Sequence, residues 1–336
     1  MGAEINRIKK WLKHRVGALF LAFLPWQFCD FGFSGRIIIE PTNHCNLKCA
    51  LCPISGLKRE RGLLSLANFK KIIDDIPGLK SINFGWAGEP LLTKEIFKMV
   101  RYAGSLGIQT TVSTNTVLLD RYEDEALSSG LDNIIVCLDG ASKETHEKYR
   151  AGSDFESIKG NIREFCLEKQ KRRLKKPQIS LQCLLTKHNE RELPAIIKLA
   201  GDLRVDKLDF KTLSLGSTAS LPEKIIRARD FLPSAKFSRY NLKEGKPVLK
   251  SKPKLCSWLR QAVILWNGDV TTCCYDMEGS STVGNVFRDG GFRKVWQSEK
   301  YKRYRRKIIR EEFALCRNCS RTDEYTQSYV PTHKNS

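Results

Sequence analysis

Cys45-Asn46-Leu47-Lys48-Cys49-Ala50-Leu51-Cys52 places three thiols in eight residues, directly after a short apolar run. A C-x3-C-x2-C spacing lets one loop wrap around an iron–sulfur cluster, supply three sulfur ligands and leave one iron open. A structural zinc site would need four ligands. His44 is the nearest further ligand, but it adjoins Cys45 and is sterically awkward. The stretch therefore predicts an iron–sulfur cluster with one open coordination position.

Short β-rich runs alternate with longer helical ones around this loop. The apolar run at 36–41 precedes it, and a helix over 66–76 follows, with Ser65 as its N-cap and Pro77-Gly78 at its end. Further strands are expected at 81–84, 109–113, 133–138, 179–185 and 207–212, and helices at 94–106, 120–128, 155–170 and 190–203. Strands that are each followed by a helix predict an α/β fold with a parallel sheet, open or curled into a barrel. In such folds the chemistry lies at the carboxyl ends of the strands.

Composition and charge limit the class of protein. The 336 residues suffice for one large and one small domain, and a hydrophobic share of 41% excludes disorder, collagen and coiled coil for the whole chain. Twelve cysteines are too dilute for a small disulfide scaffold. Because the thiols are grouped and no secretion signal is present, we expect metal binding and a cytoplasmic protein.

The beginning of the chain is basic over 7–15 and apolar over 16–24, and Pro25 and Trp26 follow. It lacks a small-x-small cleavage site, and nine apolar residues are far short of the ~20 that a membrane span needs. We therefore keep 1–32 in the mature protein as a helical segment. Two interpretations remain: a helix that docks on its own domain, or membrane-surface contact with anionic lipid through residues 7–26.

A second group of thiols follows a Lys-, Gly- and Pro-rich stretch, and we expect a linker over 236–254 between a core domain at 33–235 and a small domain at 255–325, with 326–336 as a tail. The small domain opens with a predicted hairpin around Asn267-Gly268. The proposed ligands are four separated thiols: Cys256, Cys273, Cys316 and Cys319. They suit either a zinc ribbon or a fully ligated [4Fe-4S] cluster. Cys274 competes with Cys273, because neighbouring strand residues point to opposite faces.

Four cysteines lie outside both groups, in apolar strand or helix contexts: Cys29, Cys137, Cys166 and Cys183. Apolar surroundings favour a small buried hydrophobic side chain over a metal ligand.

The Cys45–Cys52 run resembles the signature of the radical S-adenosylmethionine (SAM) superfamily, and the resemblance extends over roughly residues 36–322. It implies a partial (β/α)6 TIM-like barrel whose three cysteines bind a [4Fe-4S] cluster with SAM at the open iron. Trp86-Ala87-Gly88-Glu89-Pro90 looks like the glycine-glycine-glutamate motif that meets the methionine amino group, with Ala87 in place of the first glycine. Ser113-Thr114-Asn115 is similar to the segment that contacts the SAM ribose and carboxylate.

Two further positions of this resemblance concern the SAM pocket. Leu138-Asp139-Gly140 fits the fourth strand of the family, and Arg150 beyond it is expected either to touch the SAM carboxylate or to form a structural ion pair. Leu51 stands where the family often has an aromatic residue. Adenine would then pack against Leu51, and against Leu184 or Leu185 on the fifth strand.

The second thiol group resembles the SPASM/twitch extension of many radical SAM enzymes. Its hairpin, Gly284-Asn285 and Val295-Trp296 match the body of that extension, and a single C-x2-C favours the shorter twitch form with one auxiliary [4Fe-4S] cluster. The resemblance therefore implies a small α+β cluster-binding domain at the carboxyl end of the chain.

The resemblance implies an oxidoreductase in which a 5′-deoxyadenosyl radical abstracts hydrogen from the substrate and the auxiliary cluster accepts an electron. Oxidation of an alcohol to a ketone in a small, phosphorylated or glycosyl metabolite is our first expectation. A SPASM-type peptide or protein maturase is the alternative, disfavoured because only about 35 residues precede the first strand. A zinc scaffold without activity is the third. Four residues are candidates for the base: Tyr275, Asp276, Lys211 and Asp139.

The chain carries 58 Lys and Arg against 37 Asp and Glu, a formal charge of +21. Basic runs at 169–176 and 300–310 suit phosphates of an anionic substrate or anionic lipid, or are solvated helix faces. The same field would attract an acidic flavodoxin- or ferredoxin-type electron donor. We expect no nucleic-acid partner, because no basic motif is interleaved with aromatic residues.

Overall fold

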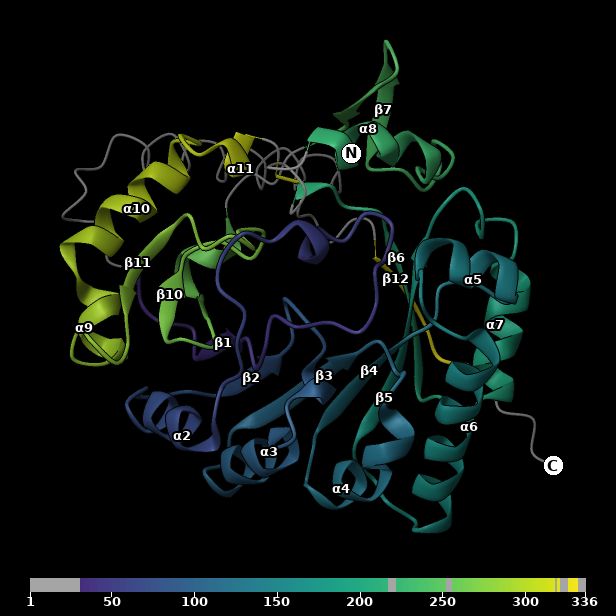
Figure 1. Cartoon of the computed structure of the whole chain (residues 1–336), viewed down its shortest axis with the longest axis horizontal. Helices are drawn as coiled ribbons and strands as arrows, with labels where there is room; N and C mark the ends of the chain where they lie inside the picture. Colours follow the sequence, from purple (N-terminus) through teal and green to yellow (C-terminus); the bar gives the residue numbers. More distant parts are fainter. Residues whose placement is uncertain (1–30, 217–221, 252–255, 318, 321–325, 332–336) are drawn as a thin grey trace, which may run out of the picture.

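The structure is a computed structural model that describes residues 31–216, 222–251, 256–317, 319–320 and 326–331. The N-terminal segment at 7–26 and Cys29 lie outside these residues. Parallel strands pair in chain order: β1 (Arg36–Ile39), β2 (Ser81–Phe84), β3 (Gln109–Thr114), β4 (Asn133–Cys137), β5 (Gln178–Leu185) and β6 (Lys207–Thr212). The pairing confirms the predicted α/β fold, and the sheet curves into a partial barrel (Figure 1).

Helices cover the outer side of this curved sheet (Figure 1). They are α2 (Leu66–Asp74), α3 (Ile96–Ser105), α4 (Glu123–Ser128), α6 (Phe155–Lys171) and α7 (Leu193–Asp202), with α5 (Lys143–Tyr149) beyond β4. The Ser65 hydroxyl accepts a hydrogen bond from the Asn68 amide, which confirms the predicted cap of α2. Short 3-10 turns lie at Pro53–Gly56, Pro90–Leu92, Leu119–Tyr122, Ala228–Asp230 and Ser257–Arg260.

Strand side chains alternate between the helical layer and the inner face of the sheet. Ile37, Ile39 and Phe84 are buried in one core together with Phe69 of α2. Burying each such side chain contributes about 1.5–3 kcal/mol. The alternate positions are partly exposed and more polar, and include Asn83, Thr111, Ser113, Asp209 and Lys211. The inner face can therefore hold polar ligands while the outer face holds the fold together.

The small domain continues the barrel sheet. β9 (Ala262–Ile264) pairs in parallel with β1, and β10 (Asp269–Thr271) and β11 (Thr282–Asn285) follow in antiparallel order. Three helices complete it: α9 (Phe292–Gln297), α10 (Glu299–Ile309) and α11 (Ala314–Arg317). The predicted hairpin around Asn267-Gly268 is present. Because β9 lies beside β1, the second thiol group is carried to the same sheet as the first.

Two segments differ from their expected roles as linker and tail. Within 236–254, β7 (Tyr240–Lys243) and β8 (Lys246–Leu249) form an antiparallel hairpin, which follows α8 (Pro222–Arg227). In the expected tail, β12 (Thr326–Tyr329) pairs with β6 at the far edge of the sheet. The sequences of these short segments give little indication by themselves that they form strands.

Several basic side chains of the run at 169–176 form ion pairs with acidic side chains. Lys169 pairs with Asp206 at 2.7 Å, Arg172 with Glu168 and Asp124, and Lys176 with Asp132. In the run at 300–310, Arg305 is fully buried, with its guanidinium 4.1 Å from the Trp296 ring centroid and 4.0 Å from that of Tyr301. These contacts give Lys169, Arg172, Lys176 and Arg305 structural roles.

Three cysteines are buried as predicted: Cys137, Cys166 and Cys183. Among the described residues, no helix is long and apolar enough to cross a membrane.

Candidate active site

The predicted thiols lie in the loop after β1, at the carboxyl end of the sheet. The loop is fixed by backbone hydrogen bonds from Lys48 to Ala151 (3.0 Å) and from Ala50 to Tyr149 (2.8 Å). Cys45, Cys49 and Cys52 are free and partly exposed. Burial, together with the nearby thiols Cys52 and Cys45, raises the pKa of the Cys49 thiol to about 12, and Arg150 opposes the rise. Three desolvated thiols in one loop need a positive partner to ionise together, and an iron–sulfur cluster supplies it.

Gly88, in the loop after β2, lies against the backbone of the cysteine loop. Its φ is +72°, and a Cβ atom there would sit 2.4 Å from the Thr42 carbonyl oxygen and 2.6 Å from that of His44. The neighbouring Glu89 amide donates to the His44 carbonyl at 2.8 Å. Gly88 thus allows the close backbone approach that its sequence position predicts.

The Glu89 carboxylate is buried and joins two loops. It accepts hydrogen bonds from the Leu91 amide (3.1 Å), the Thr114 hydroxyl (2.7 Å) and the Asn115 amide (2.7 Å). Burial raises the pKa of Glu89 and these hydrogen bonds counteract the rise. Most lone pairs of the Glu89 carboxylate already have protein partners. Contact between this carboxylate and the methionine amino group of SAM therefore stays a prediction.

Asn115 connects the end of β3 to the cysteine loop. Its side-chain amide donates to the Asn46 side-chain oxygen at 2.7 Å and lies 3.9 Å from the Cys45 sulfur. Ser113 stands two residues earlier on the partly exposed inner face, and Ala87 is fully buried. The structure therefore brings the three predicted SAM-contacting segments to one place.

Two residues in these loops have a positive φ, a backbone conformation that residues with a side chain rarely adopt. Trp86 has φ of 87° and Thr116 has φ of 75°. Bulky and β-branched residues rarely adopt positive φ, and such strain often marks functional loops. Trp86 is the first residue of one predicted SAM-contacting segment, and Thr116 directly follows the other.

Arg150 forms a buried ion pair with Asp139. Its Nε donates to Asp139 at 2.6 Å, while the other Asp139 oxygen accepts from the Leu184 amide at 2.7 Å. Of the two expectations for Arg150, the structural ion pair is present. Its charge also lowers the pKa of the Cys49 thiol, so Arg150 acts electrostatically on the cysteine loop.

An apolar cluster surrounds Leu51 of the cysteine loop. Leu51 is buried against residues that follow β6, including Leu213 and Phe231, with Leu184 packed at its edge. The expected neighbours Leu51 and Leu184 thus share one cluster, whereas Leu185 belongs to the main core. Adenine contact with these side chains stays a prediction.

Lys224 of α8 holds the other end of the cysteine loop. Its ammonium donates to the Cys52 carbonyl and, at 2.8 Å, to the Ser55 hydroxyl. The side chain is buried, which lowers the pKa of Lys224. No local sequence signal marks this lysine, because 172 residues separate it from Cys52.

The second thiol group draws its residues from three segments of the small domain: Cys256 before β9, Cys273 after β10, and Cys316 and Cys319 in and after α11. Besides burial, the neighbouring thiols Cys256 and Cys316 raise the pKa of Cys273, and Cys256 and Cys319 raise the pKa of Cys316. Burial raises the pKa of the Cys316 thiol to about 12. Within the described part of the chain, no three His, Cys, Asp or Glu side chains are already arranged to hold a metal ion. Ligation of an auxiliary cluster by Cys256, Cys273, Cys316 and Cys319 therefore stays a prediction.

Cys273 and Cys274 have different surroundings. The Tyr275 amide donates to the Cys273 sulfur at 3.4 Å, an interaction typical of metal-bound thiolates. Cys274 is buried in an apolar cluster with Trp258 and Leu265. These surroundings favour Cys273 as the ligand.

Trp86 connects the loop after β2 with the turn that carries Cys273 and Cys274. Its indole N–H donates to the Cys274 carbonyl at 2.6 Å, and its ring packs on the apolar cluster around Cys274. Arg59, just beyond the cysteine loop, lies over the Trp86 ring and donates to the Met277 carbonyl at 2.7 Å. Sequence reasoning missed Arg59 and the role of Trp86, because their partners are more than 180 residues away.

The candidate bases are not equivalent in the structure. Asp276 accepts hydrogen bonds from Thr271, Ser280 and Ser281 and is buried, so it holds the turn after β10. Asp139 is bound to Arg150. The Tyr275 hydroxyl accepts a hydrogen bond from Ser214 at 2.9 Å, and Lys211 lies on the partly exposed inner face. Burial raises the pKa of Tyr275, and the assignment of the base among the four residues stays a prediction.

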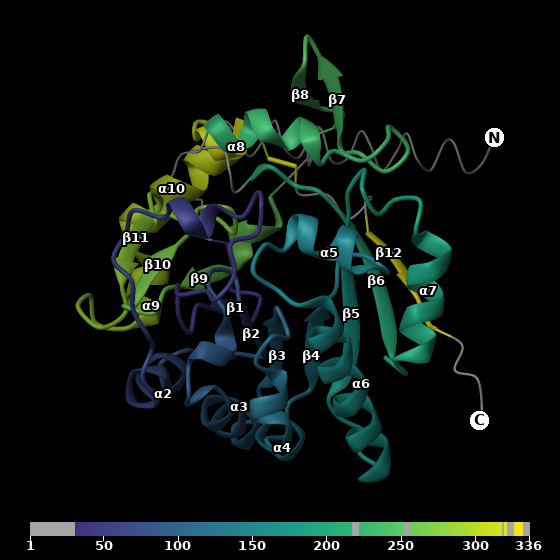
Figure 2. The same cartoon turned by 45° about the vertical axis from the view of Figure 1, so that its right-hand side comes forward.

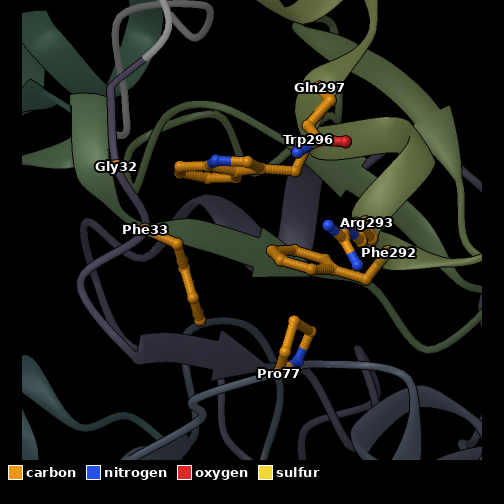
Figure 3. A pocket seen from close by; sticks show the side chains of 7 residues that line it. All are labelled: Gly32, Phe33, Pro77, Phe292, Arg293, Trp296 and Gln297. Atoms are coloured by element: carbon orange, nitrogen blue, oxygen red, sulfur yellow. The ribbon is translucent and has the colours of Figure 1, made fainter.

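A separate cavity of about 400 Å³ lies near the start of the sheet, at the other end from the loop of Cys45, Cys49 and Cys52. Its walls are the rings of Phe33, Phe292 and Trp296, with Pro77 and Arg293 at the rim (Figure 3). Phe33 precedes β1 and Pro77 precedes β2, whereas the loop of Cys45, Cys49 and Cys52 follows β1. The cavity is therefore not part of the candidate active site.

The structure is a parallel half-barrel with three thiols beyond its first strand. A second thiol group belongs to an extension of the same sheet. Together these features define a class of iron–sulfur enzymes. Comparisons with known families identify the particular one. The radical SAM superfamily profile matches residues 39–200, and the profile of the SPASM iron–sulfur cluster-binding domain matches residues 256–320. The chain belongs to the radical SAM superfamily and carries a SPASM-type domain. These domains imply a [4Fe-4S] cluster with SAM and auxiliary iron–sulfur binding.

Individual relatives differ in their reactions. The chain is 27% identical to a tungsten-containing aldehyde ferredoxin oxidoreductase cofactor-modifying protein of Pyrococcus furiosus, over 85% of this chain and 87% of that one. It is 24% identical to a PqqA peptide cyclase of Rhodopseudomonas palustris, over 82% and 77% of the two chains. Its fold is similar to the crystal structure of BtrN in complex with AdoMet and 2-DOIA, with a TM-score of 0.56 and 19% identity, over 88% and 96% of the two chains.

His146, on α5 beside this site, gives a prediction on pH. Its Nδ1 accepts from the Asp139 amide at 3.0 Å, the ring is fully buried, and burial lowers the pKa of His146 to about 4. The unfolded chain takes up this proton near pH 6.5 and the folded chain does not. We expect the free energy of unfolding to fall by about 1.4 kcal/mol per pH unit as the pH drops from 6.5 towards 4.

Urea unfolding of the wild type and His146→Asn at pH 7.5 and 5.5 checks this. The asparagine side chain can accept the same amide hydrogen bond but does not titrate, so the pH-dependent loss should be smaller in the variant by about 1.4 kcal/mol. An equal loss in both proteins would show that His146 is not buried in its neutral form.

Proposed function

We propose that the protein oxidises a small, anionic, phosphorylated or glycosyl metabolite by radical SAM chemistry, with its auxiliary cluster as electron acceptor. The observation that carries this proposal is the pair of thiol groups at one end of the sheet, linked by the hydrogen bond from Trp86 to Cys274. A cluster beside the substrate site suits removal of an electron from a substrate radical.

The ligand assignment follows from the two thiol groups. Cys45, Cys49 and Cys52 would hold the [4Fe-4S] cluster that binds SAM, and Cys256, Cys273, Cys316 and Cys319 would hold the auxiliary [4Fe-4S] cluster. When reduced, the first cluster supplies the electron that cleaves SAM to a 5′-deoxyadenosyl radical. The protein binds, orients and shields the reacting groups.

The surrounding residues would position SAM. The Ala87–Gly88 backbone and Asn115 border the cysteine loop, and Ser113 presents its hydroxyl from the inner face. Arg150 would stabilise negative charge near Cys49 from its fixed position on Asp139. The net charge of +21 supports both an anionic substrate and an acidic flavodoxin- or ferredoxin-type electron donor.

A peptide or protein maturase of the SPASM type is the second candidate. The PqqA peptide cyclase among the relatives favours it, because this chain matches 77% of that enzyme's length. The two candidates differ in substrate size and share the same two cluster assignments, so one set of variants serves both.

Cysteine variants test the separate roles of the two thiol groups. Cys45→Ala should abolish formation of 5′-deoxyadenosine, because the open iron is lost with its cluster. The double variant Cys316→Ala/Cys319→Ala should still cleave SAM but lose substrate oxidation. Anaerobic reconstitution should give roughly eight irons per wild-type chain and about four in the double variant.

Mass spectrometry of SAM turnover with candidate metabolites and with candidate precursor peptides is the decisive measurement. We expect 5′-deoxyadenosine coupled to a two-dalton loss from a metabolite. The same loss or a crosslink in a peptide would favour the maturase instead. Bound zinc without iron in either thiol group would contradict both candidates.

A further inference from the structure

The β7–β8 hairpin and the adjoining α8 form a projection whose outer end has no role in the fold or in the proposed chemistry. Figures 1 and 2 both show the hairpin extending beyond the body of the molecule. Its base is fixed, because Tyr240 is buried, accepts a hydrogen bond from the Leu215 amide at 2.8 Å and packs with Leu249 against the Leu51 cluster. The outer end is thus an exposed tip on a well-anchored base.

Aliphatic side chains are exposed at this outer end. The exposed fractions are 63% for Ile226, 56% for Leu242 and 41% for Val248. In the strand register Leu242 faces Pro247, and Val248 faces Asn241 on the opposite side of the hairpin. We call Ile226, Leu242, Pro247 and Val248 the apolar tip. Because its members lie on both faces of the hairpin, one concave protein groove would not cover them all.

Cations surround the apolar tip. The exposed cations of the described segments 223–251 are Arg227, Arg229, Lys236, Lys243, Lys246 and Lys250, and the exposed anions are Glu223, Asp230 and Glu244. Lys243 and Lys246 face each other next to the turn. Two lysines beside exposed aliphatic groups allow simultaneous contact with lipid headgroups and the outer acyl region.

We propose that the apolar tip binds an anionic lipid surface, with Leu242 and Val248 entering the interface and Lys243 and Lys246 contacting the headgroups. The exposure of Leu242 and Val248 on opposite faces argues for lipid over an acidic peptide. A peptide that lies along one strand edge, or in the hollow of about 210 Å³ between α8 and the hairpin, would leave Val248 or Leu242 uncovered. The proposal concerns a different segment of the sequence from the predicted membrane contact through residues 7–26, and it does not depend on the proposed reaction.

Vesicle binding of the full chain tests this proposal. The probes are vesicles of phosphatidylcholine with 30% phosphatidylglycerol and vesicles of phosphatidylcholine alone, in 0.1 M salt, with co-sedimentation as the readout. We expect binding to the anionic vesicles. Leu242→Asp/Val248→Asp and Lys243→Glu/Lys246→Glu should each weaken it by about tenfold or more.

Matched controls carry the same changes elsewhere. Val330→Asp places an acid at a side chain that is 82% exposed, and Lys300→Glu/Lys307→Glu reverses two exposed charges on α10. Both should bind as the wild type does. Thermal unfolding should be unchanged in the tip variants, and Leu242→Ser/Val248→Ser replaces the aspartate variant if that variant is unstable.

Three outcomes would overturn the proposal: no binding of the wild type to anionic vesicles, equal binding of wild type and tip variants, or tip-dependent binding of polyglutamate without vesicle binding. The second would place the membrane contact elsewhere on the chain, and the third would favour an acidic peptide partner. SAM cleavage should be unchanged in every tip variant, so the test is independent of the proposed function.

Discussion

Gly88→Ala is expected to lower the free energy of unfolding by about 3 kcal/mol or more and to prevent iron incorporation at the first thiol group. Alanine at φ of +72° costs about 1–2 kcal/mol by itself. Its methyl group would also lie 2.4 Å from the Thr42 carbonyl oxygen, and no flexible side chain is there to move aside. The cysteine loop would have to shift, and the three thiols with it.

Gly104→Ala is the matched control. Gly104 lies in α3 with ordinary helical backbone and is exposed, and a methyl group added there would have no neighbouring atom within 4 Å. Alanine there should stabilise the protein by about 0.5–1 kcal/mol. Urea unfolding and iron analysis after anaerobic reconstitution compare the two variants. Full iron content in Gly88→Ala would show that the close contact does not position the cysteine loop.

The sequence predicts the barrel well because its strands carry a local signal. Alternation of buried and partly exposed residues in strands such as Gln109–Thr114, with capped helices between them, is visible within a short window. The cysteine loop is equally local. Its three thiols lie within eight residues, so their spacing alone indicates the kind of site.

Pairings between distant segments could not be predicted in this way. The parallel contact of β9 with β1 and the antiparallel contact of β12 with β6 depend on register between strands more than 100 residues apart. The stretch at 240–249 is rich in lysine and has only four residues per strand, a composition that is equally typical of a linker. Its hairpin is stabilised by the burial of Tyr240 and Leu249 against a distant cluster.

The same limit applies to the candidate site. The order of the cysteine, Gly-Glu and Ser-Thr-Asn segments identified three neighbouring loops, and the structure joins them through Glu89 and Asn115. Lys224 and Arg59 were not predicted, because each reaches its partner from an unrelated segment. Buried charges of this kind carry no sequence pattern of their own.

Arg59→Met is expected to lower the free energy of unfolding by about 3–5 kcal/mol at pH 8. The Arg59 guanidinium pairs with both oxygens of Glu40, one at 2.9 Å, and the Glu40 side chain is fully buried. Methionine has a similar length but leaves this carboxylate without its counter-ion and removes the hydrogen bond to Met277. Urea unfolding of the reconstituted protein measures the effect.

An exposed pair provides the control. Lys98 and Glu95 lie 3.9 Å apart with side chains 64% and 40% exposed, so Lys98→Met should cost less than about 0.5 kcal/mol. The double variant Arg59→Met/Glu40→Gln should recover part of the loss, because a neutral amide replaces the unpaired charge. Equal effects of Arg59→Met and Lys98→Met would show that the Glu40 pair is open to solvent.

The dependence of the Arg59→Met effect on pH distinguishes a lost counter-ion from lost packing. Burial already raises the pKa of Glu40 with Arg59 present, and removal of the guanidinium should raise it further. A carboxyl whose folded pKa exceeds its unfolded value stabilises the fold below the unfolded pKa, and this contribution is lost as the pH rises through the folded pKa. The gap between wild type and Arg59→Met should therefore widen from pH 5 to pH 8. A gap that stays constant over this range would mean that the arginine acts by its packing alone.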